Sequence, residues 1–257
     1  RAHMKAIIIG AGRGSRLEHL TNEVPKTLVD VMGRPMLDQI LDALDYAGFK
    51  RKDTVFIAGY QADVVRERYP DLTFVENTTW ESNNILLSLL YARDFMKDGF
   101  VSTYADIIYT NEIASGVAQS PHPIALGCDT DWRRRYTRRT HHPESDAEKL
   151  VAEGERVVRL SRTIASEEAS GEFIGVMKVS AGAVPSFLEM FDHTAQEFSG
   201  KTFREGRSFE KAYLLDFLEH ARQKGMQLHR VDTIGGYMEI DTLQDRELAA
   251  DWWRGLS

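Results

Sequence analysis

The sequence has only one cysteine, Cys128, among its 257 residues. No disulfide can form within the chain, and we expect a reducing, cytoplasmic compartment. No apolar run approaches the roughly 18 residues of a membrane span, so we expect no membrane association. Basic residues are not in excess either: 32 Lys and Arg face 39 Asp and Glu, which gives a formal net charge of −7. This balance argues against nucleic-acid binding, and an anionic substrate must be held by a local cluster of basic groups.

Short apolar segments alternate with segments of helical periodicity in the first half of the chain. Five segments are predicted strands: residues 5–9, 54–58, 72–75, 100–104 and 123–127. Helices are predicted between them, one starting at Pro35 with Leu37, Ile40, Leu41 and Leu44 on one face, the others over residues 62–69 and 84–96. This alternation favours an α/β fold with a mostly parallel sheet covered by helices.

The pattern changes after Asp129. Residues 132–148 are polar and rich in arginine, which predicts a long excursion from the core that serves as a flap. Further strands are predicted at 157–160, 173–179, 228–231 and 237–240, and helices at 187–198 and 209–224. Thr242 is expected to cap a last helix. We expect residues 1–3 to be a cloning remnant and residues 4–257 to form a single domain.

A glycine-rich loop, Gly10-Ala11-Gly12-Arg13-Gly14-Ser15-Arg16-Leu17, directly follows the first strand. It lacks the third glycine of the dinucleotide-binding motif, and it lacks the Gly-Lys-Ser/Thr ending of a P-loop. Its glycines still allow backbone N–H groups to approach phosphate oxygens, and Arg13 and Arg16 add positive charge. A plain strand-to-helix turn with solvated basic residues remains the alternative.

Several motifs together resemble a known family. The glycine loop, followed by Pro25-Lys26-Thr27-Leu28 and Gly33-Arg34-Pro35-Met36-Leu37, resembles the opening of sugar-phosphate nucleotidyltransferases. Trp80-Glu81-Ser82-Asn83-Asn84, Tyr104-Ala105-Asp106-Ile107-Ile108-Tyr109 and Glu239-Ile240-Asp241 resemble the branch of phosphocholine and phosphonate cytidylyltransferases. The middle of the chain, with Asp131-Trp132, Asp146-Ala147-Glu148 and Phe173-Ile174-Gly175, is most similar to phosphonate and phosphoamino-acid relatives.

The resemblance runs from Met4 to about residue 250 and carries structural expectations. It implies a Rossmann-like, GT-A-like mixed sheet, mostly parallel and flanked by helices. It also implies a small inserted acceptor-binding subregion, which we place at approximately residues 129–180 as an insertion or lid. CTP is the implied nucleotide donor and Mg²⁺ the implied cofactor.

The nucleotide is expected to bind at the glycine loop. The candidate residues are Ala11, Gly12, Gly14, Ser15, Arg16, Lys26, Asn83 and Asn84. Arg16 and Lys26 are also the candidate catalytic residues, because they would neutralise the triphosphate and the departing pyrophosphate. Asn83 and Asn84 precede an apolar helix, so one of them is expected to cap that helix and the other to contact the ribose or the base.

The candidate metal ligands are carboxylates at strand ends. Asp106 follows the fourth predicted strand, where open α/β sheets place their ligands. Asp241 follows a late strand, and Glu239 points the same way as Asp241 in an extended segment. Mg²⁺ prefers such oxygen ligands. The alternatives are that an aspartate only caps a helix and that Glu239 pairs with a loop arginine.

A separate set of residues is expected to bind the acceptor. Candidate residues are Trp132, Tyr136, Arg139, Glu148, Lys149 and Glu172. Arginine or lysine suits a phosphate or phosphonate, and aromatic rings suit a cationic head such as choline. The alternatives are a solvated arginine-rich loop and aromatic residues of the core. His141 and His142 lack zinc-site spacing with Cys128 and are expected at the surface.

The sequence therefore predicts a Mg²⁺-dependent cytidylyltransferase. CMP passes from CTP to a small phosphonate or phosphate, such as hydroxyethylphosphonate, aminoethylphosphonate or phosphocholine, and pyrophosphate is released. Attack by the acceptor's own anionic oxygen needs no protein nucleophile. A hexose-1-phosphate uridylyl- or thymidylyltransferase and a non-catalytic nucleotide sensor remain as alternatives. The oligomeric state stays open, with a homodimer as one option.

Overall fold

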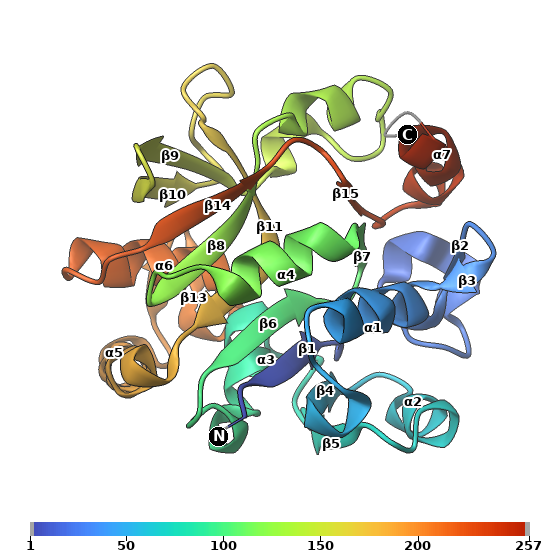
Figure 1. Ribbon diagram of the computed structural model, residues 1–257, viewed down its shortest axis with the longest axis horizontal. Helices are drawn as coiled ribbons and strands as arrows, with labels where there is room; N and C mark the ends of the chain where they lie inside the picture. Colours follow the sequence, from blue (N-terminus) through green and yellow to red (C-terminus); the bar gives the residue numbers. More distant parts are fainter. Residues whose placement is uncertain (1–2, 255–257) are drawn as a thin grey trace.

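The computed structural model describes residues 3–254 as a sheet covered by helices (Figure 1). Its helices are α1 (Met36–Tyr46), α2 (Ala62–Arg68), α3 (Ile85–Leu90), α4 (Asn111–Gln119), α5 (Val184–Phe198), α6 (Leu214–Gln223) and α7 (Leu243–Arg254). Its strands are β1 (Lys5–Ile9), β2 (Asp30–Val31), β3 (Arg34–Pro35), β4 (Thr54–Ala58), β5 (Thr73–Glu76), β6 (Phe100–Tyr104), β7 (Ile107–Tyr109), β8 (Ile124–Asp129), β9 (Lys149–Glu153), β10 (Arg156–Ser161), β11 (Gly171–Val179), β12 (Thr202–Arg204), β13 (Arg207–Ser208), β14 (His229–Thr233) and β15 (Tyr237–Glu239). None of the described helices is long and apolar enough to cross a bilayer.

Nine strands form the central sheet in the order β5-β4-β1-β6-β11-β8-β14-β10-β9. The first four run parallel, and β11 runs antiparallel to β6 and β8. Alternate residues of β1 enter two cores: Ile7 and Ile9 pack with α3, α5 and α6, whereas Ala6 and Ile8 pack with α1, α2 and α4. A strand buried on both faces needs apolar residues throughout, which explains the continuous run at 5–9. The predicted mixed α/β fold is confirmed.

The strand register brings the predicted site residues to one edge of the sheet. Ile9 of β1 lies beside Tyr104 of β6, so the glycine loop and Asp106 leave neighbouring strand ends. Strand β15 pairs antiparallel with β7, and the Ile240 N–H donates to the Asp106 carbonyl at 2.8 Å. This short ribbon carries Asp241 from the far end of the chain to Asp106.

The prediction of a solvated excursion at residues 132–148 is wrong for about half of the segment. Trp132, Arg135, Tyr136, Arg139 and His142 are buried, whereas Arg133, Arg134 and Arg138 are exposed. The buried arginines and His142 are matched by carboxylates elsewhere in the chain. The segment forms no strand of the central sheet, and its service as a flap stays a prediction. Strands β9, β10 and β11, which fall within the expected insertion, are part of the central sheet.

Element boundaries differ most where the helical pattern is short. The helix predicted at 84–96 is α-helical only to Leu90, and the helix predicted at 209–224 starts with a 3-10 turn at Phe209–Lys211 and becomes α-helical at Leu214. Helix α4 and strands β7 and β9 were not predicted. The Thr242 cap is confirmed, because its hydroxyl accepts the Asp245 N–H at 3.1 Å.

Gly175 bends β11 beneath the site and provides a test of this packing. Its φ is +80°, and an added Cβ would lie 2.3 Å from Tyr104 Cδ2. We expect Gly175→Ala to lower the free energy of unfolding by about 1–3 kcal/mol, because a left-handed backbone and a ring clash both oppose it. Urea unfolding measures the change. Gly182→Ala is the control, since Gly182 is exposed and has no neighbour within 4 Å of an added Cβ. Equal midpoints for the two variants would contradict the packing.

Candidate active site

Lys26 lies between the two candidate metal carboxylates. Its Nζ is 2.9 Å from Asp106 Oδ2 and also donates to Asp241 Oδ1. The close approach depends on Gly14, whose φ is +74° and whose added Cβ would lie 2.5 Å from Lys26 Cδ. The loop glycine therefore makes room for the lysine stem.

This trio has unusual electrostatics because its groups share a buried space. Burial raises the pKa of Asp106 to about 6, against the opposing effect of Lys26. Burial also acts to raise the pKa of Asp241, but Lys26 and His142 outweigh it and hold this pKa below its usual range. Burial acts to lower the pKa of Lys26, yet the two carboxylates hold it above its usual value. The carboxylates thus need a cation between them.

A small cavity of about 130 Å³ opens on the glycine-loop side of Lys26. Gly10, Gly12 and Gly14 line it together with Lys26 and Asp106. Arg16 does not line this cavity: its Nη2 lies 3.5 Å from Asp241 Oδ2, and 55% of its side chain is exposed. Ala11 is buried and its carbonyl accepts the Tyr60 N–H at 2.9 Å, which fixes the loop. Ser15 follows Gly14 at the start of a short helical turn.

One of the two predicted asparagines caps a helix, as expected from the sequence. Asn84 Oδ1 accepts the Ile85 N–H at 2.9 Å, so Asn84 caps α3. Asn83 and Asn77 exchange two side-chain hydrogen bonds of 2.9 and 3.0 Å, and Asn83 also donates to Thr79 Oγ1 at 2.8 Å. Contact of Asn83 with the ribose or the base stays a prediction.

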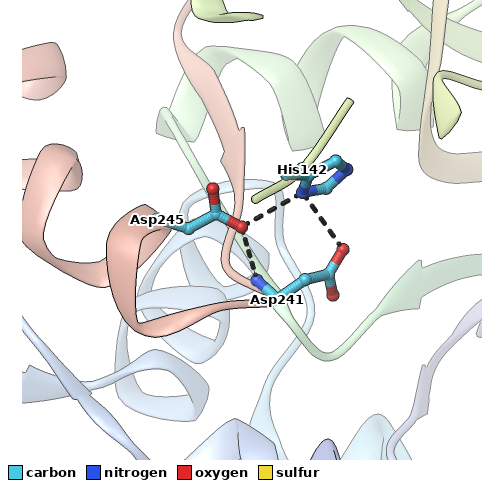
Figure 2. Close-up of side chains that lie close together, drawn as sticks. All are labelled: His142, Asp241 and Asp245. Carbon is cyan, nitrogen blue, oxygen red and sulfur yellow. Dashed lines mark hydrogen bonds and ion pairs between the residues drawn. The ribbon is translucent and has the colours of Figure 1, made fainter. Parts of the chain in front are cut away.

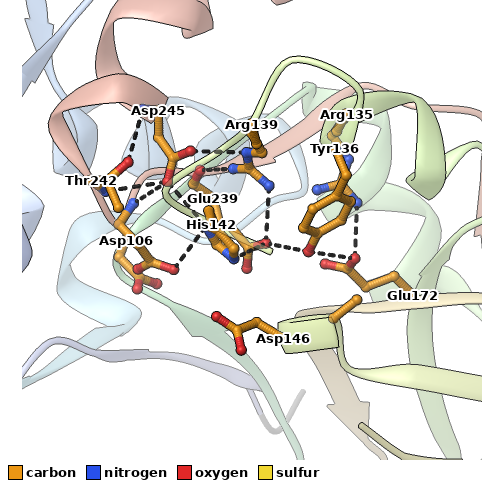
Figure 3. A network of polar contacts seen from close by, with 12 residues as sticks. Asp106, Arg135, Tyr136, Arg139, His142, Asp146, Glu172, Glu239, Thr242 and Asp245 are labelled. Atoms are coloured by element: carbon orange, nitrogen blue, oxygen red, sulfur yellow. Dashed lines mark hydrogen bonds and ion pairs between the residues drawn. The ribbon is translucent and has the colours of Figure 1, made fainter. Parts of the chain in front are cut away.

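A buried network of charges stands behind the carboxylates (Figure 3). Glu239 Oε1 accepts the Tyr136 hydroxyl at 2.9 Å and lies 3.2 Å from His142 Nε2. Arg139 Nη2 donates to the Glu239 carbonyl at 2.6 Å, and its Nη1 lies 3.4 Å from Glu239 Oε1. Glu239 is thus paired with a loop arginine, which was the alternative to a metal ligand.

The network continues to Glu172. The Tyr136 hydroxyl reaches Glu172 Oε2 at 3.1 Å, and Arg135 Nη2 lies 3.5 Å from the same oxygen. Arg135 Nε also donates to Asp129 at 3.0 Å. Burial raises the pKa of Glu172 to about 7, although Arg135 opposes this. These groups compensate one another inside the protein.

A second cavity, of about 270 Å³, opens on the other side of Lys26. Its lining residues are Arg16, Lys26, Asn84, Ile85, Tyr104, Asp106, His142, Asp146, Glu148, Arg162, Tyr213, Glu239 and Asp241. We call this cavity the acceptor cleft. It meets the glycine-loop cavity at Lys26, Ile85 and Asp106.

Among the predicted acceptor residues, only Glu148 lines the acceptor cleft. Tyr136, Arg139 and Glu172 belong to the buried network, and Trp132 packs edge-on against Tyr136. Lys149 Nζ donates to the Arg162 carbonyl at 2.6 Å. Their contact with an acceptor stays a prediction.

Five polar or aromatic residues that line the cleft were not among the predicted site residues: Tyr104, His142, Asp146, Arg162 and Tyr213. His142 was expected at the surface, which is right for the exposed His141 and wrong for His142. Arg162 lies 4.8 Å from the centre of the Tyr213 ring, and its Nε donates to the Asp146 carbonyl at 2.9 Å. Tyr104 donates to Glu148 at 3.2 Å. A polar residue after an apolar strand was the only sequence signal for Arg162, and it is weak.

The residues present fit a divalent cation. Asp106 and Asp241 converge on one positive charge, the Lys26 ammonium, and two carboxylates plus phosphate oxygens are what Mg²⁺ takes in many nucleotide sites. Glu239 is near, but its Oε1 is already engaged by Tyr136 and His142. The donor set therefore favours Asp106 and Asp241 over Glu239.

Lys26→Met tests whether the two carboxylates depend on a cation. Removal of one partner from a buried pair costs about 3–5 kcal/mol. Because the Asp106 side chain is 33% exposed, we expect a loss of about 1–3 kcal/mol in unfolding free energy when EDTA is present. Added Mg²⁺ should reduce the loss, because ligand binding stabilises the folded state. Lys50→Met, at an exposed pair, is the control. Equal urea midpoints for both variants in EDTA would contradict the interpretation.

Comparison with known proteins agrees with this geometry. The chain is 28% identical to the CTP:phosphoglutamine cytidylyltransferase of Campylobacter jejuni over 95% of this chain and 98% of that protein. It is 38% identical to the 2-aminoethylphosphonate cytidylyltransferase of Lancefieldella rimae over 42% of this chain and 44% of that protein.

Solved structures share the fold. The CTP:phosphocholine cytidylyltransferase of Streptococcus pneumoniae has a TM-score of 0.70 at 20% identity, over 96% of this chain and 98% of that one. The inositol-1-phosphate CTP transferase of T. maritima has a TM-score of 0.71 at 21% identity, over 100% and 99%. The profile of the MobA-like NTP transferase domain matches residues 6–150, more than half of the chain. The resemblance seen in the motifs is confirmed: this protein belongs to the family of MobA-like NTP transferase domains and is a nucleotidyltransferase.

Proposed function

We propose that this nucleotidyltransferase moves CMP from CTP to a small phosphonate or phosphate and releases pyrophosphate. The observation that carries the proposal is the junction of two cavities at Lys26 and Asp106. A nucleotide held on the glycine-loop side would present its α-phosphate at this junction, and an acceptor in the acceptor cleft would reach it from the other side. Relatives that act with CTP on such acceptors support the choice of substrates.

The glycine loop would hold the triphosphate through backbone N–H groups and the side chains of Arg16 and Lys26. Asp106 and Asp241 would hold Mg²⁺, which supplies charge neutralisation at the phosphates when bound. Lys26 would then exchange its carboxylate partners for phosphate oxygens. We assign Glu239 to the support of this centre, because it is held by Arg139, His142 and Tyr136.

The reaction is a single in-line displacement. An anionic oxygen of the acceptor forms a bond to the α-phosphorus of CTP, and the bond from that phosphorus to the pyrophosphate oxygen breaks. No proton has to leave the attacking oxygen, so no protein base is required. The protein contributes position and positive charge, the two effects that dominate phosphoryl transfer.

The proposed domain roles follow from this arrangement. Residues 132–148 form one wall of the acceptor cleft, with Glu148 facing the acceptor. Tyr136, Arg139 and Glu172 shape that wall from behind, and Trp132 packs against it. Lys149 supports it by holding the carbonyl of Arg162.

A substrate matrix tests the proposal. CTP, UTP, ATP and GTP are each combined with choline phosphate, 2-aminoethylphosphonate, 2-hydroxyethylphosphonate and glucose 1-phosphate, and pyrophosphate release is measured. We expect CTP with a phosphonate or choline phosphate to give the fastest release. Preference for UTP with glucose 1-phosphate would replace this proposal with the hexose-1-phosphate alternative, and no release with any pair would favour a nucleotide sensor.

Asp106→Asn and Asp241→Asn test the metal carboxylates. Both changes keep the shape and remove the charge, so we expect turnover to fall by at least about 100-fold while the fold is retained. More CTP alone should not restore turnover. If one aspartate served only as a cap, its variant would be nearly wild type, because Asn caps about as well as Asp. Turnover by pyrophosphate release and unfolding by circular dichroism separate the two outcomes.

Glu148 indicates what kind of acceptor the cleft takes. Its Oε1 accepts the Tyr104 hydroxyl at 3.2 Å, while the nearby Arg162 pairs with Asp146 instead. Burial raises the pKa of Glu148 to about 8, although Arg162 opposes this. A carboxylate in this position gains most from a cation supplied by the ligand, and the Tyr104 and Tyr213 rings line the same cleft. This favours an acceptor with a positively charged end.

Glu148→Gln should therefore separate cationic from neutral acceptors. A charge-assisted contact contributes about 1.5–3 kcal/mol, so above about pH 8, where Glu148 is charged, we expect KM for choline phosphate to rise roughly 10- to 100-fold. KM for 2-hydroxyethylphosphonate should change little. In the wild type, KM for choline phosphate relative to hydroxyethylphosphonate should fall as pH rises through about 8, because Glu148 is neutral below its pKa and charged above it. Asp146→Asn, on the same cleft but paired with Arg162, is the control. Equal losses for both acceptors would contradict this role of Glu148.

A further inference from the structure

His142, in the segment of residues 132–148, contacts carboxylates at and after the C-terminal end of β15 (Figure 2). Its Nδ1 lies 3.1 Å from Asp245 Oδ2 and 3.5 Å from Asp241 Oδ2. Its Nε2 lies 3.2 Å from Glu239 Oε1. The side chain is buried, so these carboxylates surround a ring that water hardly reaches. No motif and no expectation from the sequence had given His142 a task.

Asp245 completes a rigid frame around Asp241. Its Oδ2 accepts the backbone N–H groups of Asp241 at 3.0 Å and Thr242 at 3.2 Å, which fixes the turn into α7. The same Oδ2 faces His142. The main chain of Asp241 and the imidazole are thus held by one carboxylate.

The two oxygens of Asp241 face different partners. Oδ1 accepts from Lys26, on the side of Asp106. Oδ2 faces His142 at 3.5 Å and Arg16 at 3.5 Å. The position of His142 therefore favours the side-chain rotation of Asp241 in which Oδ1 points toward Asp106. Without His142 the buried Oδ2 would lose a cationic or hydrogen-bonding neighbour, and the carboxylate could turn.

The cluster of His142, Asp241 and Asp245 is compact enough to be considered as a metal site itself. Arg139 argues against this, because its Nε lies 2.9 Å from Asp245 Oδ1. A guanidinium at this distance already neutralises Asp245, and Oδ2 is already engaged by two backbone N–H groups. The cluster fits a support for a neighbouring cation better than a second cation.

We propose that His142 is a positioning residue that, together with Asp245, holds the Asp241 carboxylate in the orientation needed to share a divalent cation with Asp106. This inference rests on the proposed function, because it takes Asp106 and Asp241 as the cation ligands. His142 also belongs to residues 132–148, which form one wall of the acceptor cleft in the proposed function. The same segment therefore forms a wall of the acceptor cleft and orients the cation ligand Asp241.

Mn²⁺ binding measured by electron paramagnetic resonance tests the inference without turnover. Free Mn²⁺ is titrated with wild type, His142→Ala, His142→Gln and His141→Ala in the presence of CTP. Loss of a group that orients a metal ligand typically weakens metal affinity about 10- to 100-fold, and we expect this for His142→Ala. His142→Gln keeps a side-chain amide in the space and should give a smaller loss. His141→Ala, at the exposed neighbour, should match wild type.

Kinetics give an independent measure. For His142→Gln, raising Mg²⁺ should recover turnover, whereas raising the acceptor at low Mg²⁺ should not. A residue that only stabilises the fold would lower the urea midpoint and leave the Mn²⁺ affinity of the folded protein unchanged, and that result overturns the inference.

Two further variants serve as a substitute for His142→Ala and as a reference for the cation site. If His142→Ala does not fold, Asp245→Asn serves in its place, because an amide oxygen can still accept the Asp241 and Thr242 N–H groups while the charge that faces His142 is removed. It should weaken Mn²⁺ as well, and wild-type affinity in both His142→Gln and Asp245→Asn would overturn the inference. Asp241→Asn is the reference for the site. If Asp241→Asn binds Mn²⁺ like wild type, the proposed cation site fails, and the fault then lies with the proposed function.

Discussion

The ammonium of Lys26 between Asp106 and Asp241 is the interaction on which this site depends. The buried carboxylate of Asp241 and the partly buried one of Asp106 repel each other, and the pairing of β15 with β7 brings them together. A positive charge must therefore be present in every state of the site. Gly14 allows the lysine stem to approach, and Arg16 adds a second cation beside Asp241. The glycine loop thus serves the carboxylates in the free protein, and under the proposed function it would also hold the phosphates of a nucleotide.

The charges around the acceptor cleft fall into two groups with different consequences. Glu172, Glu239 and Asp245 each have an arginine from residues 135–139 within reach. Such compensated groups have little to offer a ligand. Glu148, by contrast, has a tyrosine hydroxyl and no ion pair among the described contacts, and it faces open space. Under the proposed function, we expect the group that the protein leaves uncompensated to set ligand preference, because that group gains most from a charge supplied by the ligand.

The sequence predicted the fold where local pattern and tertiary environment agree. Strands β1 and β4 are buried on both faces, so their apolar runs mark their bounds. Asp106 and Asp241 could be found because strand ends of an open sheet are where ligands gather. Burial of Arg135 and Arg139 could not be predicted, because a solvated arginine and a paired one look alike in sequence. The partners of Arg139 and His142 lie about a hundred residues away, at Glu239 and Asp245.

The buried ionic network contributes orientation of side chains more than stability of the fold. Buried ion pairs are weak contributors to stability, and well-packed apolar residues of similar volume would often serve the fold equally well. Apolar packing, however, cannot fix which way a carboxylate points. Arg139 and His142 satisfy Glu239 and Asp245 through defined atoms, and Asp245 in turn holds the main chain of Asp241. The ionic network therefore fixes orientation. Each pair limits the side-chain rotation of the next residue, and the last residue in this series is Asp241, whose Oδ1 faces Lys26.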